Sequence, residues 1–115
     1  DLRGTARPDW LLQVTNDAWF GRLTGPFQHA AQARLRAIEQ GLPLVRVANT
    51  GVTAVYDARG RETASLPFEV AAYLDAALPG ALPATPYARF GEEPLLVLLA
   101  CLALALIAPL RRHRP

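Results

Sequence analysis

A short polar and aromatic stretch, Asn16-Asp17-Ala18-Trp19-Phe20-Gly21, is the part of this sequence best suited to bind a ligand. It follows an apolar run of strand length, and ligands of α/β sheets bind at the carboxyl ends of strands. Two aromatic rings beside two polar groups can line a pocket for an acyl chain or a head group. Alternatively, the Asn-Asp pair starts an Asx turn and the rings fill the core. The candidate binding residues are Asn16, Asp17, Trp19 and Phe20.

Three polar residues on the next expected helix are candidates for supporting this site: His29, Arg36 and Glu39. A neutral imidazole at the start of a helix can hydrogen-bond a neighbouring loop. Arg36 and Glu39 are three residues apart, which is the spacing of a side-chain pair on one helix face. At the surface such a pair contributes little, whereas a half-buried pair would stiffen the wall of the site.

The sequence offers neither a metal site nor a usable nucleophile. The only other histidine, His113, lies in the C-terminal tail, so His29 has no partners with which to bind a metal. Cys101 is the single cysteine and lies in an apolar run, where no base is at hand to activate its thiol. The chain contains no lysine. We therefore assign no catalytic residue, no metal and no cofactor.

The elements that position the candidate residues follow from the hydrophobic pattern. Residues 10–15 form a strand with little polar alternation, so we expect burial on both of its faces. A helix over 27–40 starts near Thr24-Gly25-Pro26 and ends at Gly41 in the left-handed conformation. Its apolar residues fall at helical spacing on one stripe, with alanines beside it that permit close approach to a sheet: Phe27, Ala31, Leu35 and Ile38, then Ala30, Ala33 and Ala37.

Further strands are expected at 44–48, 53–57, 62–65 and 70–74. A hairpin turn over 58–60 places Gly60 at a positive φ. The sequence therefore predicts an α/β fold, with one strand before the helix and several after it.

The C-terminal part of the chain consists of two segments of different composition, one rich in proline and one without charge. Residues 79–93 are rich in proline, which disfavours a helix, and we expect an extended connector. Residues 94–110 carry no charge, and these 17 residues form a helix about 26 Å long, slightly shorter than the hydrocarbon core of roughly 30 Å. We expect a transmembrane helix there, the alternative being a buried core helix followed by a basic tail.

The net charge of +2 does not indicate nucleic-acid binding. Three arginines lie in the tail, at 111, 112 and 114, which leaves nine arginines against ten acidic residues in residues 1–93. A basic tail of residues 111–115 suits a membrane flank, with the C-terminus cytoplasmic and residues 1–93 outside. We expect a membrane partner and no nucleic acid. The chain is long enough for one domain, begins at Asp1 and lacks methionine, so we expect the C-terminal piece of a longer protein.

Five stretches, taken in order, strongly resemble bacterial apolipoprotein N-acyltransferase, a branch of the nitrilase or carbon–nitrogen hydrolase superfamily. The helix motif at 33–39 indicates only the superfamily, whereas the first loop and the last stretch are more specific to the acyltransferases. The stretches are Asn16-Asp17-Ala18-Trp19-Phe20-Gly21, Gly25-Pro26-Phe27-Gln28-His29, Ala33-Arg34-Leu35-Arg36-Ala37-Ile38-Glu39, Arg46-Val47-Ala48-Asn49-Thr50-Gly51 and Thr85-Pro86-Tyr87-Ala88-Arg89-Phe90-Gly91.

The resemblance implies an α-β-β-α sandwich in the periplasm of an inner-membrane enzyme. Residues 1–78 would be the C-terminal part of that domain, followed by the connector 79–93, a transmembrane helix over 94–110 and the tail 111–115. The implied reaction moves a fatty acyl group from a phospholipid donor to the α-amino group of a diacylglyceryl-cysteine lipoprotein. A cysteine thioester carries the acyl group, a carboxylate is the general base and a lysine stabilises the oxyanion.

The family's Glu, Lys and Cys lie upstream of the Asn16–Gly21 loop, so the resemblance implies that this piece alone is inactive. Trp19 and Phe20 would form a pocket wall toward the acyl chain or the lipoprotein. Asn16 and Asp17 would position the loop, and the three helix residues would support it. Half of a sandwich should expose apolar surface and strand edges. Two alternatives are a membrane-tethered amidase of the same superfamily and an inactive truncated gene product.

Overall fold

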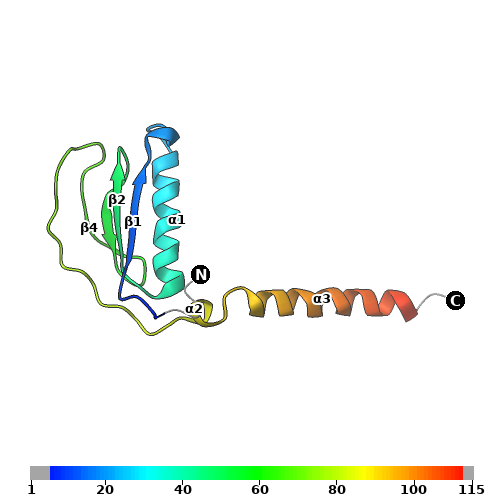
Figure 1. The fold of residues 1–115 in the computed structure, drawn as a ribbon. Helices are drawn as coiled ribbons and strands as arrows, with labels where there is room; N and C mark the ends of the chain where they lie inside the picture. Colours follow the sequence, from blue (N-terminus) through cyan, green and yellow to red (C-terminus); the bar gives the residue numbers. More distant parts are fainter. Residues whose placement is uncertain (1–5, 113–115) are drawn as a thin grey trace.

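A four-stranded sheet with one long helix on one face forms the body of the protein (Figure 1). The structure is a computed structural model and describes residues 6–112. The elements are β1 (Leu11–Asn16), the 3₁₀ turn η1 (Ala18–Phe20), α1 (Gly25–Gln40), β2 (Leu44–Asn49), β3 (Ala54–Tyr56), β4 (Glu62–Ser65), α2 (Pro86–Phe90) and α3 (Glu93–Arg112).

The strands follow one another across the sheet in the order β1-β2-β3-β4. β1 and β2 are parallel, with Leu11 opposite Leu44, and α1 is the crossover between them. β2, β3 and β4 form an antiparallel meander with an irregular register at Val55/Tyr56. The expected strand-helix-strand unit and the two strands after it are confirmed, so the fold is mixed α/β.

Small residues of α1 make the closest contact with the sheet. Ala33 and Ala37 pack in the core against Leu44, Ala54 and Tyr56. The larger residues of the expected stripe stay about half exposed along the sides of the helix: Phe27, Leu35 and Ile38. Close approach through alanine is therefore confirmed, because a side chain without a γ-carbon lets the helix backbone lie near the sheet.

The expectation that β1 is buried on both faces is wrong. β1 is the outer strand of the sheet, and α1 covers only the face that carries Leu11. On the opposite face Leu12 is 58% and Val14 is 72% exposed. β1 does carry apolar residues on both faces, as the prediction assumed, but no layer among the described residues packs on the face of Leu12 and Val14. The expected exposure of apolar surface and of a strand edge is confirmed.

Two glycines end elements in the manner expected. Gly41 closes α1 at φ 64°, and its N–H donates to the carbonyls of Ala37 and Ile38 in the last turn and a half of the helix. Gly60 has φ 73° in the turn between β3 and β4. A Cβ is strained at such φ values, so both turns favour glycine.

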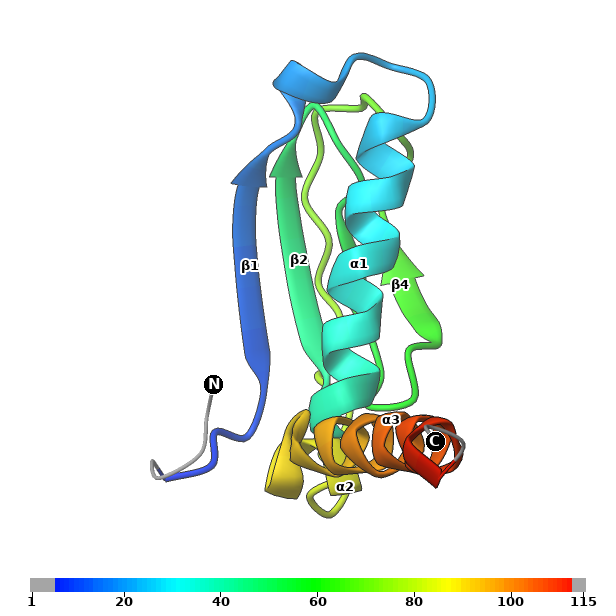
Figure 2. The ribbon, with the colours of Figure 1, turned by 90° about the vertical axis from the view of Figure 1, so that its right-hand side faces the viewer.

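The segment between β4 and α2 differs from the prediction. In this described part of the chain no strand forms over 70–74, and the segment runs extended past the sheet face opposite α1 (Figures 1 and 2). The expected connector 79–93 also contains a helix, α2, which starts at Pro86. Proline is tolerated in the first turn, and the Thr85 hydroxyl caps it by accepting from the N–H of Ala88 at 3.0 Å.

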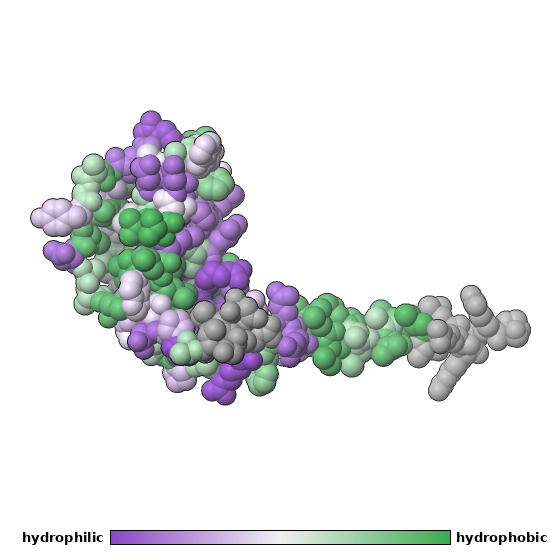
Figure 3. Space-filling view, in the orientation of Figure 1, coloured by the Kyte–Doolittle hydropathy of each residue, from purple (hydrophilic) through white to green (hydrophobic). Residues whose placement is uncertain are grey.

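The helix α3 occupies the apolar run and extends away from the sheet (Figure 1), with a strongly hydrophobic surface along much of its length (Figure 3). Across the described residues, however, no helix combines the length and the apolar character needed to cross a membrane. The expected transmembrane helix over 94–110 is therefore not supported. The uncharged run is short for a bilayer, and Glu93 lies in the first turn of the helix.

Candidate functional site

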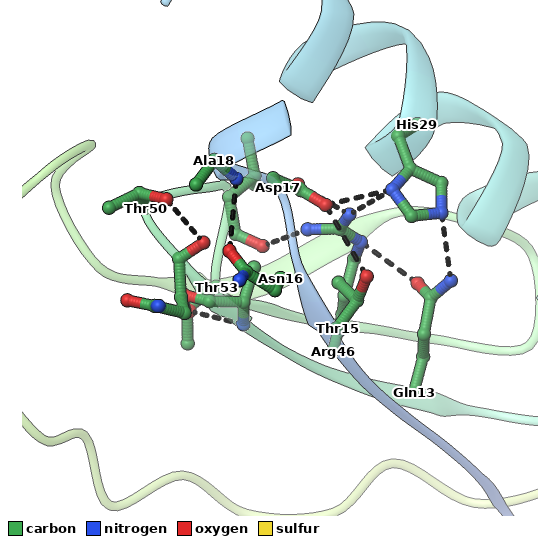
Figure 4. Close-up of polar contacts among 12 residues, drawn as sticks. Gln13, Thr15, Asn16, Asp17, Ala18, His29, Arg46, Thr50 and Thr53 are labelled. Atoms are coloured by element: carbon green, nitrogen blue, oxygen red, sulfur yellow. Dashed lines mark hydrogen bonds and ion pairs between the residues drawn. The ribbon is translucent and has the colours of Figure 1, made fainter. Parts of the chain in front are cut away.

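Asp17 and Arg46 form a fully buried ion pair at the carboxyl end of β1 (Figure 4). Arg46 lies in the middle of β2 on the face that α1 covers, and Asp17 is the residue after β1. The Nη2 of Arg46 donates to the Oδ2 of Asp17 at 2.8 Å, and neither side chain reaches solvent. Burying either charge alone would be strongly unfavourable, so each residue requires the other.

The remaining donors of Arg46 also have partners. Nε donates to the Oε1 of Gln13 on β1 at 2.9 Å, and Nη1 donates to the carbonyl of Val52. These contacts join two adjacent strands and the turn after β2 to one guanidinium. The planar, multiply donating group of arginine suits such a site, whereas a lysine ammonium would not reach the same partners.

His29, near the start of α1, completes the cluster. Its Nδ1 lies 2.8 Å from the Oδ1 of Asp17, and its Nε2 lies 3.4 Å from the amide nitrogen of Gln13. Because the Gln13 oxygen accepts from Arg46, its amide nitrogen must be the group that donates to His29. The contacts with Gln13 and Asp17 fit the tautomer in which Nδ1 carries the proton and donates to Asp17 and Nε2 accepts, while the Nη2 of Arg46 also lies 3.2 Å from Nδ1.

The environment of Asp17 favours its ionised form. Burial raises the pKa of this carboxyl, but the hydrogen bonds and the positive charge of Arg46, with the hydrogen bond from His29, outweigh the effect of burial. The pKa of Asp17 consequently lies below its ordinary value.

The turn after the ion pair is an Asx turn, as the structural interpretation expected. The Oδ1 of Asn16 accepts from the N–H of Ala18 at 3.0 Å, and the Asp17 carbonyl accepts from the N–H of Phe20 at 3.0 Å. The other half of that interpretation is wrong, because Trp19 is 85% and Phe20 is 52% exposed. The polar pair turns the chain, and the turn points both aromatic residues outward. A ligand contact by Trp19 and Phe20 remains a prediction.

Two glycines allow close packing around this turn. A Cβ added to Gly51 would lie 2.3 Å from the Oδ2 of Asp17, and one added to Gly25 would lie 2.5 Å from the Cβ of Phe20. Both distances are shorter than atoms tolerate, so the Asp17 carboxylate and the Phe20 backbone occupy space that only glycine leaves free.

Arg36 and Glu39 pair as expected, at 2.7 Å, with Arg36 largely exposed and Glu39 partly buried. They lie about two and about three helix turns beyond His29, however, and share no contact with the Asp17 cluster in the described hydrogen bonds. Arg36 instead borders a cleft of about 630 Å³ between β1, α1 and the start of α3, whose lining includes neither Trp19 nor Phe20. The structure brings His29 to Asp17 and leaves the other two residues apart.

Sequence reasoning missed Arg46 and Gln13 as members of the cluster. A signal was present, since Arg46 is the single charged residue within the apolar run Leu44-Val45-Arg46-Val47-Ala48. A charge inside a buried strand must find an opposite charge, and an aspartate at the end of the neighbouring strand is the obvious partner.

The cluster holds its neighbours in place and does not supply a reactive group. The carboxylate accepts from Arg46, His29 and the Thr15 hydroxyl, and the guanidinium donates to three acceptors, so neither group is free to attack or protonate a substrate. Within residues 6–112 no group of three or more His, Cys, Asp or Glu side chains is placed to hold a metal ion. Cys101 is exposed on α3, away from the turn.

Comparison with known proteins gives consistent results. The carbon-nitrogen hydrolase family model matches residues 3–87. Apolipoprotein N-acyltransferases are similar over nearly the whole chain: that of Bradyrhizobium diazoefficiens is 57% identical over 107 residues (93% of this chain, 19% of the relative), and that of Rhodopseudomonas palustris is 54% identical over 112 residues (97% and 20%). That of Shewanella oneidensis is 49% identical over 106 residues (92% and 20%).

The chain thus spans about a fifth of the length of the curated relatives it matches. The expected resemblance to this group is confirmed. Since the family model matches residues 3–87, most of the sequence, the chain belongs to the carbon-nitrogen hydrolase family.

Proposed function

We propose that this chain is a segment of an apolipoprotein N-acyltransferase. The observation that carries the proposal is the extent of the similarity. An alignment of 107 residues cannot fit within residues 3–87, so the likeness to these enzymes continues beyond the hydrolase match and into α3. A hydrolase that shared only the family domain would not account for that continuation.

The proposed reaction transfers a fatty acyl group from a phospholipid to the α-amino group of the N-terminal diacylglyceryl-cysteine of a lipoprotein. A cysteine thiolate attacks the acyl ester, the lipid alcohol leaves with a proton, and the amine then attacks the thioester. This sequence contains no lysine and only Cys101. The nucleophile, its carboxylate base and the lysine that stabilises the oxyanion therefore belong, in this proposal, to the rest of the enzyme.

The proposed architecture is one half of an α-β-β-α sandwich, acting at the periplasmic face of the bacterial inner membrane. The uncovered sheet face supports this architecture. It carries Leu12, Val14 and Val47, all at least 44% exposed, which are apolar side chains that a second sheet would bury.

Within this proposal Trp19 and Phe20 contact an acyl chain of the phospholipid or of the lipoprotein. Their exposure on a fixed turn supports the role, because a ligand can reach both rings without rearrangement of the core. Asn16 shapes the turn, Asp17 anchors it, and His29 supports Asp17. Arg36 and Glu39 would stiffen α1 further from the turn.

The test is an acylation assay on the full-length protein that contains this chain. The purified enzyme is mixed with phospholipid and a synthetic diacylated lipopeptide, and mass spectrometry follows the lipopeptide. A mass gain of one acyl chain on the amino group supports the proposal. If the lipopeptide stays diacylated while simple amides are hydrolysed, the protein is an amidase of the same family and the proposal is wrong.

A further inference from the structure

The Arg46 guanidinium holds three separate segments in fixed relation. It donates to Gln13 on β1, to the carbonyl of Val52 after β2, and to Asp17 in the turn after β1. The side chain is fully buried, so water does not compete for these hydrogen bonds. A charge-assisted network of this kind fixes the direction of the Asp17 side chain.

Asp17 transmits that constraint to the 3₁₀ turn. Its N–H donates to the carbonyl of Asn49 at 3.0 Å, and its own carbonyl accepts from Phe20. Its carboxylate also holds His29, whose ring lies 5.3 Å from the ring of Phe20 at a tilt of 58°. The turn is therefore attached to the buried cluster at Asp17, the residue before it, and again at Phe20, its last residue.

The space around the turn leaves little freedom for Asp17 or Phe20. The carboxylate of Asp17 fills the volume that a Cβ of Gly51 would occupy, and Phe20 packs on Gly25. Trp19 lies between these two residues and is 85% exposed. Its position accordingly depends on the residues on either side of it.

We propose that Arg46 is a positioning residue for acyl-chain binding, acting through Asp17 and His29 on the turn that presents Trp19 and Phe20. This inference rests on the proposed acyltransferase function and assigns the cluster to substrate binding. Arg46 sets the apparent affinity for the phospholipid donor and leaves the rate of the chemical step almost unchanged.

The experiment measures kcat and KM for phospholipid in acyl transfer to a saturating synthetic diacylated lipopeptide by the full-length protein, in detergent micelles. Arg46→Lys keeps the positive charge but loses the planar guanidinium that donates to three acceptors. His29→Ala removes the imidazole that donates to Asp17. We expect each variant to raise KM about tenfold with kcat within about twofold of the wild type. His29→Asn, whose amide can donate to the Oδ1 of Asp17, should recover KM to within about threefold of the wild type.

Arg61→Lys is the matched control. Arg61 also pairs with an aspartate, Asp57, at 2.7 Å, but it is largely exposed in the hairpin between β3 and β4. Both kinetic constants should stay at the wild-type values. If Arg46→Lys does not fold, the comparison of His29→Ala with His29→Asn decides the question.

A loss of kcat at unchanged KM in the Arg46 and His29 variants would overturn the inference, as would unchanged constants in folded variants. Failure of the proposed function gives a different result. In that case the wild-type enzyme forms no thioester with phospholipid and leaves the lipopeptide diacylated, whereas failure of the inference alone leaves wild-type acyl transfer intact and shows only in the constants of the Arg46 and His29 variants.

Discussion

The Oδ2 of Asp17 lies 2.8 Å from the Nη2 of Arg46, and both side chains are completely buried. A buried ion pair adds little net stability compared with apolar residues of the same shape, but loss of one partner leaves an uncompensated charge. The pair therefore makes the turn after β1 sensitive to single substitutions.

Asp17→Asn should destabilise the protein by about 3–5 kcal/mol, because Arg46 then remains buried without a counter-charge. The double variant Asp17→Asn/Arg46→Met should lose less than the sum of the two single variants, since it removes both charges together. The free energy of unfolding of the four proteins in a double-mutant cycle gives the coupling. Strict additivity would show that the pair is not coupled.

The ion pair should also make stability depend on acid pH. The pKa of Asp17 is lowered in the folded protein, so its stabilisation is fully present above the unfolded value of about 3.9 and is lost as the pH falls through the lower folded pKa. The stability difference between wild type and Asp17→Asn should thus be constant from pH 7 to about pH 5 and shrink below about pH 4. Melting temperatures measured between pH 2 and pH 7 provide the test. A difference that grows as the pH falls would contradict it.

Gly51→Ala and Gly25→Ala should each cost about 1–3 kcal/mol, because the new methyl group collides with Asp17 or with Phe20. Gly80→Ala is the matched control, since a Cβ there meets nothing within 4 Å. Thermal unfolding of the three variants distinguishes them. Equal melting temperatures for all three would show that the turn adjusts freely.

Trp19→Ala should leave stability within about 0.5 kcal/mol of the wild type, because the side chain is largely exposed. Acyl transfer by the full-length enzyme should nevertheless fall if the ring contacts an acyl chain. Kinetics and melting curves on the same preparation separate the two effects. Unchanged acyl transfer would remove Trp19 from the proposed site.

Thr85→Val should destabilise the junction between α1 and α2 by about 1–2 kcal/mol. The Thr85 hydroxyl accepts from Ala88 and donates to the carbonyl of Glu39, and valine can do neither. Thr85→Ser retains the hydroxyl and should recover most of the loss. Hydrogen exchange at the Ala88 amide reports on the cap directly, and equal protection in the valine and serine variants would rule it out.

Local signals were enough to predict most of the fold. Gly41 and Gly60 ended their elements as expected, and the alanines on α1 predicted close helix-sheet packing. These features depend on neighbours a few residues away. The burial of β1 could not be predicted in the same way, because it depends on which layers cover the strand, and Leu12 and Val14 face no second layer in the described chain.

The candidate site was predicted only in part for a similar reason. The turn at Asn16 and the proximity of His29 to the loop follow from short-range chemistry. Trp19 looked equally suited to a core or to a surface, since a large aromatic ring fits either. The partnership of Arg46 with Asp17 joins residues 29 positions apart, and it becomes visible only when β1 and β2 are placed side by side.

The helix α1 connects two features that are otherwise unrelated. His29 near one end of α1 contacts Asp17 just before the aromatic turn, and the carbonyl of Glu39 near the other end accepts from the Thr85 hydroxyl just before α2. Figure 2 shows α2 and the start of α3 at the end of α1 opposite this turn. Its 16 residues make a rod about 24 Å long. The helix therefore acts as a spacer of fixed length, which sets how far the Trp19 ring stands from the base of the apolar helix α3.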